Sequence, residues 1–399
     1  MSASTRAVEP EQAPAAVAPP PGHPRFPLLD SMRAIAVVCV LLTHTGSLSG
    51  ANDRDWFGPF TSRLTLGVTI FFLISGFLIY RPFVNVRLNG ARPTRTVDFF
   101  RRRLLRIVPA YWVALTVVAL AAAAPRAFSG DWWVYYGLLQ AYDPAWFDKG
   151  IGAAWSLSTE VAFYVTLPLY AFAAARLLAG RRRAEQVRLE LIALAALGTA
   201  SVIARTVIAQ ADRNAPFGHA TTFGITLPGT FLWFALGMAL AVVSVSIQAG
   251  GREPRLIGAV ARRPWAPWSA AAVLFVVLSV GIGLPRTGLV SLTVPQRIAE
   301  HLLVGAIALL LLLPAIFGDR AGGWPRRVLA DRRLAWLGLI SYGVFLWHLP
   351  IAVKLAGKGA NDWLPGGAFI SLTVLTAVAA TLAAAASYYV LERPLLRRK

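Results

Sequence analysis

The chain has 399 residues, of which 56% are hydrophobic and only 15% are charged, and its net charge is +20. Soluble domains carry about 25% charged residues, so this composition excludes an ordinary soluble protein and favours a chain that crosses a membrane many times. A strongly basic chain can also bind nucleic acid, but here the basic residues fall in the connections between apolar segments, which excludes that partner.

The first segment, residues 1–27, is rich in Ala, Pro and Glu and lacks the apolar stretch of a signal peptide. We expect a disordered tail, because such a segment buries too little apolar surface to fold. Ten apolar segments follow, each long enough or nearly long enough for a membrane helix of about 20 residues. They comprise residues 28–48, 64–80, 107–124, 155–178, 189–210, 225–247, 266–284, 297–317, 335–354 and 366–391. The aromatic segment 132–142 is too short to cross and is expected at the interface or as a re-entrant piece.

The sequence therefore predicts an all-α membrane domain of about ten transmembrane helices over residues 28–391, followed by a basic tail, 392–399. Lys and Arg set its orientation, because basic connections stay in the cytoplasm. The stretches 81–106, 176–188, 252–263, 320–333 and 393–399 hold 26 Lys and Arg residues, whereas the alternate stretches 49–63, 125–154, 210–224, 285–297 and 354–365 hold 9. We expect both termini in the cytoplasm and a multi-pass protein of the cytoplasmic membrane.

The segment 28–48 carries Asp30, Arg33 and His44 in an otherwise apolar run. Ionisable groups inside a membrane are costly and often functional. Arg33 and His44 are 11 residues apart, so they share one helix face about 16 Å apart along the axis, and Asp30 lies one turn before Arg33, where the two can pair. The structural alternatives are an interfacial anchor for Arg33 and a helix–helix hydrogen bond for His44.

Ser75 and Gly76, in the second span, favour close helix packing. Arg103 and Arg106 lie one turn apart where the third span begins. Their forked guanidinium groups suit phosphate, and the alternative is ordinary charge on a cytoplasmic connection.

Glu160 lies near the outer end of the fourth span, at a depth comparable with that of His44. A carboxylate beside a histidine orients the imidazole and raises its basicity, whereas the alternative is a carboxylate at the membrane surface. Trp155 and Tyr164 fit an interfacial aromatic belt, and we place them with Ser156 as candidate cavity residues.

His348, in the outer half of the ninth span, is a further cavity candidate or a histidine satisfied between helices. Arg205, Glu300 and His301 also lie near outer ends of spans, where they either extend the polar cavity or pair with one another. Arginines at one end and a His/Glu pair towards the other suit a long donor with a phosphate head. The sequence shows no internal repeat and no Walker, Rossmann or metal-ligand spacing, so no metal site is predicted.

These motifs resemble the acyltransferase-3 family of integral-membrane O-acyltransferases over nearly all of residues 28–399. The similar segments are "LLDSMRAIAVVCVLLTHT" with Arg33 and His44, "RRLLR" with Arg103 and Arg106, "AWSLSTEVAFY" with Glu160, "ISYGVFLWHLP", and "LERPL". Two positions depart from the family pattern: Ser31 replaces the usual Gly, and Val161 replaces the second of a usual pair of Glu residues.

The resemblance implies no permanently bound cofactor, a cytoplasmic acyl-CoA, commonly acetyl-CoA, as co-substrate, and an acceptor hydroxyl, usually on a sugar. Many relatives carry a fused SGNH-type esterase domain, and here such a partner is expected to be a separate protein. The arginine-rich, lysine-poor composition is typical of a bacterium with a GC-rich genome.

The resulting hypothesis is O-acyl transfer, with Arg33, Arg103 and Arg106 binding acyl-CoA and His44 acting as general base, oriented by Glu160. In a variant, His44 first takes the acyl group itself. His348, Asp30, Trp155, Ser156 and Tyr164 are candidates for the cavity or the acceptor site. The alternative functions are a multi-pass transporter or flippase, in which the buried charges line a path, and a non-catalytic scaffold.

Overall fold

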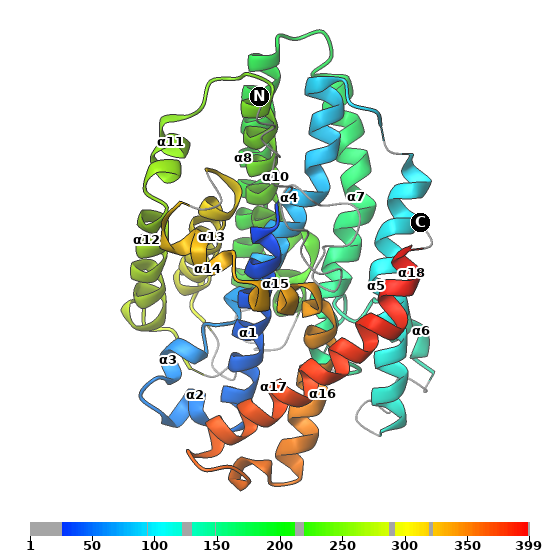
Figure 1. The fold of residues 1–399 in the computed structure, drawn as a ribbon, viewed down its shortest axis with the longest axis vertical. Coiled ribbons are helices and arrows are strands. Elements are labelled where there is room, and N and C mark those ends of the chain that lie inside the picture. The colour runs from blue at the N-terminus through cyan, green and yellow to red at the C-terminus, as the bar shows by residue number, and fades with distance from the viewer. Residues whose placement is uncertain are drawn as a thin grey trace, which may run out of the picture.

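The computed structural model describes residues 26–93, 95–121, 130–147, 149–211, 219–286, 292–318 and 322–397. Within these ranges the regular secondary structure is helical and includes no β-strand (Figure 1). The predicted disordered tail lies outside the described residues except for Phe26 and Pro27, and so do the last two residues of the predicted basic tail. Phe26 packs edge-on against Phe77, with ring centroids 4.9 Å apart.

The helices differ widely in length. They are α1 (Leu28–Leu48), α2 (Ala51–Arg54), α3 (Gly58–Thr61), α4 (Leu66–Asn89), α5 (Thr96–Leu120), α6 (Trp132–Tyr136), η2 (Gly152–Ala154), α7 (Trp155–Leu177), α8 (Arg183–Ala211), α9 (His219–Ile225), α10 (Leu227–Gln248), α11 (Arg255–Arg262), α12 (Trp265–Val276), η3 (Val277–Gly281), α13 (Val294–Ile316), α14 (Gly323–Leu329), α15 (Arg332–Leu339), α16 (Ser341–Gly357), η4 (Ala360–Asp362), α17 (Ala368–Ser387), η5 (Tyr388–Glu392) and α18 (Arg393–Arg397).

Eight helical segments of the described chain are long and apolar enough to cross a membrane. They are Leu28–Leu48, Gly58–Asn89, Thr96–Leu120, Gly152–Leu177, Arg183–Ala211, Thr222–Gln248, Val294–Ile316 and Ala368–Arg397. Two further candidate spans are bent, α11 with α12 and η3 by 97°, and α15 with α16 by 70°. The predicted all-α bundle of about ten membrane helices is therefore confirmed, and the side on which each terminus lies stays a prediction.

The two bends lie where the sequence interrupts the helix. Arg263 precedes Pro264, a position that disfavours helical backbone. Between α15 and α16, Ile340 separates the two helices, and Asp331 caps the start of α15 by accepting from the backbone N–H of Arg333 at 2.8 Å and of Leu334 at 3.0 Å. The predicted span 335–354 corresponds to this second bent pair, and its bend was not predicted because hydropathy does not register a change of direction between two apolar helices.

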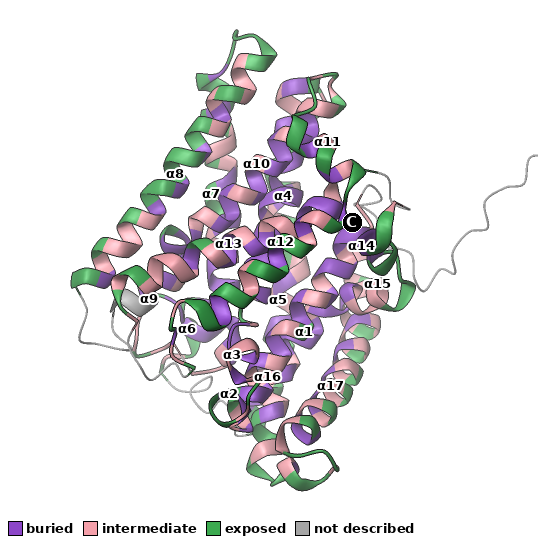
Figure 2. Ribbon diagram, turned by 90° about the vertical axis from the view of Figure 1, so that its left-hand side faces the viewer, coloured by how far each residue is buried: buried purple, intermediate pink, exposed green. Residues whose placement is uncertain are grey.

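The helices α1, α4 and α10 form the buried interior, whereas α8 is largely exposed along its length (Figure 2). The helices α4 and α10 approach closely at two glycines. An added Cβ would lie 2.4 Å from the carbonyl oxygen of Phe234 at Gly76, and 2.1 Å from that of Leu73 at Gly237. The packing role predicted for Gly76 is confirmed. The close crossing also fixes the face of α4 that carries Ser75.

The bent α15 lies across the beginning of α1. An added Cβ at Gly338 would lie 1.8 Å from the carbonyl oxygen of Asp30, so only glycine permits this approach. The aromatic segment predicted not to span forms the short helix α6. It packs on α5 through hydrogen bonds from Tyr111 to the carbonyl of Tyr135 at 2.7 Å and from Trp112 to that of Tyr136 at 2.9 Å.

Candidate functional site

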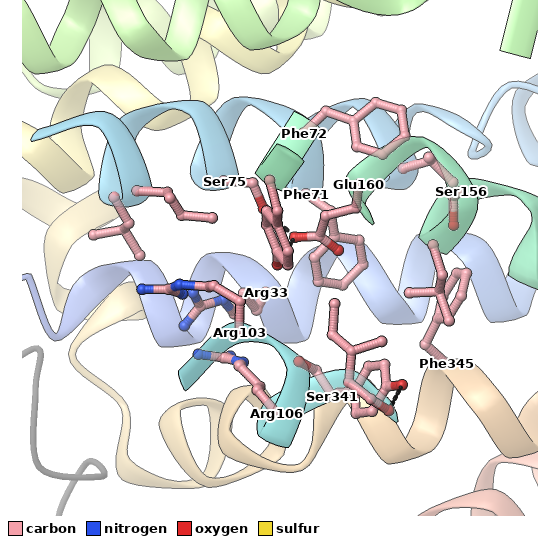
Figure 3. Close-up of a pocket in the computed structure, with 17 residues that line it drawn as sticks. Arg33, Phe71, Phe72, Ser75, Arg103, Arg106, Ser156, Glu160, Ser341 and Phe345 are labelled. Carbon is pink, nitrogen blue, oxygen red and sulfur yellow. Dashed lines mark hydrogen bonds between the residues drawn. The ribbon is translucent and has the colours of Figure 1, made fainter. Parts of the chain in front are cut away.

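The interior holds a cavity that we call the arginine cavity. Its volume is about 70 Å³, and it lies between α1, α4, α5, α7 and α16. Its polar lining residues are Arg33, Ser75, Arg103, Arg106, Ser156, Glu160, Tyr164, Ser341 and Tyr342. Figure 3 shows the three arginines gathered at one end, Glu160 near the middle, and Ser156 and Phe345 towards the other end. Arg33, Arg103, Arg106, Ser156, Glu160 and Tyr164 are thus brought together as sequence candidates.

The three arginines of this cavity differ in whether a carboxylate forms a salt bridge with the guanidinium group. Arg33 donates to a carboxylate oxygen of Asp30 at 2.7 Å, so the pairing predicted from their spacing is confirmed. Among the described residues, no carboxylate lies within salt-bridge distance of Arg103 or Arg106. The Nε of Arg103 is buried and has no hydrogen-bond partner within the described ranges. Two guanidinium groups without a salt bridge, beside a third that has one, favour this end of the cavity as a site for an anion such as phosphate.

Glu160 is held by two hydroxyl groups. Ser75 on α4 donates to its Oε1 at 2.6 Å, and Tyr164, one turn further along α7, donates to the same oxygen at 2.7 Å. Its other oxygen accepts no hydrogen bond from the described part of the chain. The sequence analysis assigned Ser75 to helix packing and missed its contact with Glu160, because a neutral serine in a membrane span, unlike a charged residue, is not unusual. The free carboxylate oxygen remains available to a substrate.

A second cavity, which we call the histidine cavity, has a volume of about 230 Å³. Its polar and aromatic lining residues are Thr43, His44, Thr65, Thr69, Trp155, Arg205, Thr230, Trp233, Glu300 and His301. Val68 and Phe345 line both this cavity and the arginine cavity. The two cavities therefore meet at one apolar partition, with the adjacent residues Trp155 and Ser156 on opposite sides of it.

His44 and Glu160 lie on the walls of these adjoining cavities and do not hydrogen bond to each other in this structure. The ring neighbour of His44 is His348, with centroids 5.3 Å apart and planes at 41°. His348 is fully buried, and its Nδ1 lies 2.7 Å from the carbonyl oxygen of Phe345 and 3.1 Å from that of Val344. A carbonyl only accepts, so Nδ1 carries the proton, while Nε2 is buried without a partner in the described part of the chain.

The remaining sequence candidates at this end do not all pair with one another. Glu300 forms an ion pair with Arg63 at 3.6 Å. Arg205 donates to the backbone carbonyls of Gly224 and Gly229, and His301 packs against Trp233. The three extend the polar cavity, as one of the two alternatives foresaw. Within the described ranges, no cluster of three His, Cys, Asp or Glu side chains is placed to hold a metal ion.

Fold and cavities together define a multi-pass helical membrane protein with two joined polar chambers. The chain belongs to the acyltransferase-3 family, whose model, described as an acyltransferase domain, matches residues 26–389. The resemblance inferred from the motifs is therefore confirmed.

Three relatives illustrate this membership. The chain is 25% identical to the peptidoglycan O-acetyltransferase OatA of Listeria monocytogenes, over 82% of this chain and 49% of that protein. It is 25% identical to Nodulation protein 10 of Rhizobium leguminosarum, over 92% of each, and 28% identical to the exopolysaccharide production protein ExoZ of Rhizobium meliloti, over 83% of this chain and 89% of that protein. The chain thus spans about half the length of OatA. No solved structure matches it.

Proposed function

We propose that this protein is a bacterial membrane O-acyltransferase. It moves an acyl group, most simply acetyl, from acyl-CoA in the arginine cavity to a hydroxyl of a carbohydrate-containing acceptor in the histidine cavity. The observation that carries the proposal is the meeting of the two cavities at Val68 and Phe345, with cationic groups on one side and His44 on the other. Relatives that are named peptidoglycan O-acetyltransferases support this type of reaction.

The donor enters at the arginine end. Arg103 and Arg106, which form no salt bridge with any described residue, bind its phosphates, while Arg33, already paired with Asp30, lines the path of its chain. The thioester then points along the cavity towards Phe345. The excess of basic residues in alternate connections supports a cytoplasmic location for this end, where acyl-CoA is made.

The acceptor meets the donor across the partition. His44 takes the proton of the acceptor hydroxyl, whose oxygen attacks the thioester carbonyl carbon. The carbon–sulfur bond breaks, and the CoA thiolate leaves with that proton, so that one ester and one thiol form. His348, the ring neighbour of His44, holds the imidazole in place, and the Glu160 carboxylate offsets the positive charge that develops on it.

A relay through His44 gives the same products. The imidazole nitrogen attacks the thioester, CoA leaves, and the acceptor hydroxyl then displaces the acyl group from the imidazole. Mass spectrometry of the protein held with acetyl-CoA and no acceptor separates the two routes. An acetyl group on His44 supports the relay, and an unmodified His44 supports direct transfer.

Acetyl transfer can be tested on membranes that contain the protein. They are supplied with acetyl-CoA and with envelope glycan extracted from cells that lack the gene, and released CoA thiol and new acetyl esters on the glycan are measured. We expect glycan-dependent thiol release with an equal yield of ester. His44→Ala abolishes both, and Arg103→Gln raises the KM for acetyl-CoA about tenfold or more, because it removes a charge-assisted contact.

The matched control is Arg102→Gln, which removes the same charge one position away and outside the cavity. A KM for acetyl-CoA that changes as much in this control would refute the phosphate contact. If wild-type membranes release no glycan-dependent thiol, the transferase is refuted, and a transporter or flippase of an envelope precursor takes its place. A separate SGNH-type esterase partner would appear as an increase in ester yield when that protein is added.

A further inference from the structure

We propose that His301, with Arg205 and Glu300, forms the subsite that recognises the acceptor as a neutral polyhydroxylated ring. This inference rests on the proposed transferase function and names the part of the histidine cavity that selects the acceptor. His301 is the specificity-determining residue. It hydrogen bonds to a hydroxyl of the ring other than the one that is acylated.

The first observation is an unsatisfied imidazole. His301 on α13 is 1% exposed, and both of its ring nitrogens are buried without a hydrogen-bond partner among the described residues. Burying a polar group without a partner is unfavourable, because its hydrogen bonds to water are lost and not replaced, so such a group is usually satisfied by a ligand or a water. His301 lines the same cavity as His44. An unpartnered imidazole at the proposed acceptor site is therefore a recognition group for a substrate.

The second observation is that this imidazole is held rigidly. Its ring packs against the indole of Trp233 in a tilted arrangement, with centroids 4.4 Å apart and planes at 30°. The indole N–H of Trp233 in turn donates to the backbone carbonyl of His301 at 3.1 Å. The nitrogens of His301 are thus presented in one orientation, which is what a selective hydrogen-bonding site requires.

The third observation concerns the charges around it. Arg205 offers donors only, and its Nε is buried without a partner among the residues that the structure describes. Glu300, held by Arg63, offers acceptors only. Glu300 would repel an anion, and Arg205 would repel a cation. A neutral hydroxyl can donate to Glu300 or accept from Arg205, so it is compatible with both. A neutral imidazole has one donor and one acceptor and fits the same ligand. A sugar ring has this chemistry, and the indole of Trp155 supplies an aromatic wall.

The test separates acceptor binding from donor binding in the membrane assay with acetyl-CoA and envelope glycan. His301→Phe keeps a ring on Trp233 and removes both nitrogens. We expect it to raise the half-saturating glycan concentration about tenfold, with the KM for acetyl-CoA within twofold of wild type. His301→Gln, which keeps hydrogen-bonding capacity, is expected to lie between wild type and His301→Phe.

The matched control is Ser201→Ala, one turn before Arg205 on α8 and outside the cavity, where the hydroxyl donates to the carbonyl of Pro228 at 2.6 Å. We expect this variant to leave the half-saturating glycan concentration within twofold of wild type. The subsite is refuted if His301→Phe does the same, or if both His301 variants raise the values for glycan and acetyl-CoA equally, as a folding defect would. Wild-type membranes that transfer nothing refute the proposed function itself, and the subsite falls with it.

Discussion

Glu160 is fixed by hydroxyl groups from two helices rather than by a basic side chain. Ser75 and Tyr164 both donate to its Oε1, and the arginines of the same cavity lie towards one end. Hydrogen bonds to a charged group contribute about 1.5–3 kcal/mol each, so the two hydroxyls set the position of the carboxylate. Its second oxygen, which accepts no hydrogen bond from the described residues, is the one that we assign to the donor. At the residue scale, the site therefore depends on Ser75 as well as on Glu160, the acidic residue of the sequence motif.

Ser75→Ala removes one of these two donors and leaves Tyr164. We expect acetyl transfer to fall about tenfold, with a thermal unfolding midpoint close to that of wild type, because the lost hydrogen bond positions a reacting group. Initial rates at saturating acetyl-CoA measure the effect. The control is Ser158→Ala, two residues from Glu160, whose buried hydroxyl has no partner. A rate for Ser75→Ala equal to that of the control would remove Ser75 from the site.

At the scale of the element, α15 orients the start of α1 through one glycine. Gly338→Ala would place a Cβ 1.8 Å from the carbonyl oxygen of Asp30, so the two helices must separate. We expect a loss of about 1–3 kcal/mol in the free energy of unfolding and a higher KM for acetyl-CoA, because the Asp30–Arg33 pair moves with the helix. Thermal unfolding in detergent and donor kinetics measure the two effects.

Gly357→Ala is the control for this substitution. Gly357 lies at the end of α16 and would meet nothing within 4 Å, so we expect stability equal to or above that of wild type. Equal thermal unfolding midpoints for Gly338→Ala and Gly357→Ala would show that the close contact of α15 with α1 at Gly338 does not contribute to stability.

The partition between the cavities belongs to α4 and α16. Phe345 lines both cavities. The centroid of its ring lies 6.2 Å from that of Phe71 and 5.8 Å from that of His348. We expect Phe345→Ala to open the passage and admit water, so that acetyl-CoA is hydrolysed to acetate and CoA without an acceptor. The ratio of thiol released without glycan to thiol released with it should rise severalfold. A ratio equal to that of wild type would mean that Phe345 does not shield the thioester.

At the scale of the whole molecule, the sequence predicted how far along each span a residue lies better than it predicted where a helix bends or which cavity a side chain faces. Spacing along one helix placed Asp30 one turn from Arg33, and the structure confirms that pair. Apolar length predicted about ten spans but missed the bend at Ile340, because hydropathy carries no direction. His44 and Glu160 were predicted at similar depths. Which wall each faces depends on how helices rotate against one another, and helical periodicity does not encode that. The role of Phe345 and Val68 in separating the cavities was not predicted, because apolar side chains in an apolar span look the same whether they line a cavity or face lipid.

The orientation of the whole bundle is the expectation that bears most on the mechanism. In a Cys39→Ser background, which removes the only cysteine, Asn89→Cys and Lys358→Cys place single thiols at two exposed positions, the last residue of α4 and the turn after α16. Asn89 belongs to the arginine-rich side and Lys358 to the sparsely charged side, so the first should face the cytoplasm and the second the exterior. A membrane-impermeant maleimide should label Lys358→Cys in intact cells and Asn89→Cys only after permeabilisation. The reverse pattern would place the arginine cavity outside, away from the acyl-CoA pool, and the direction of acyl transfer proposed above would be wrong.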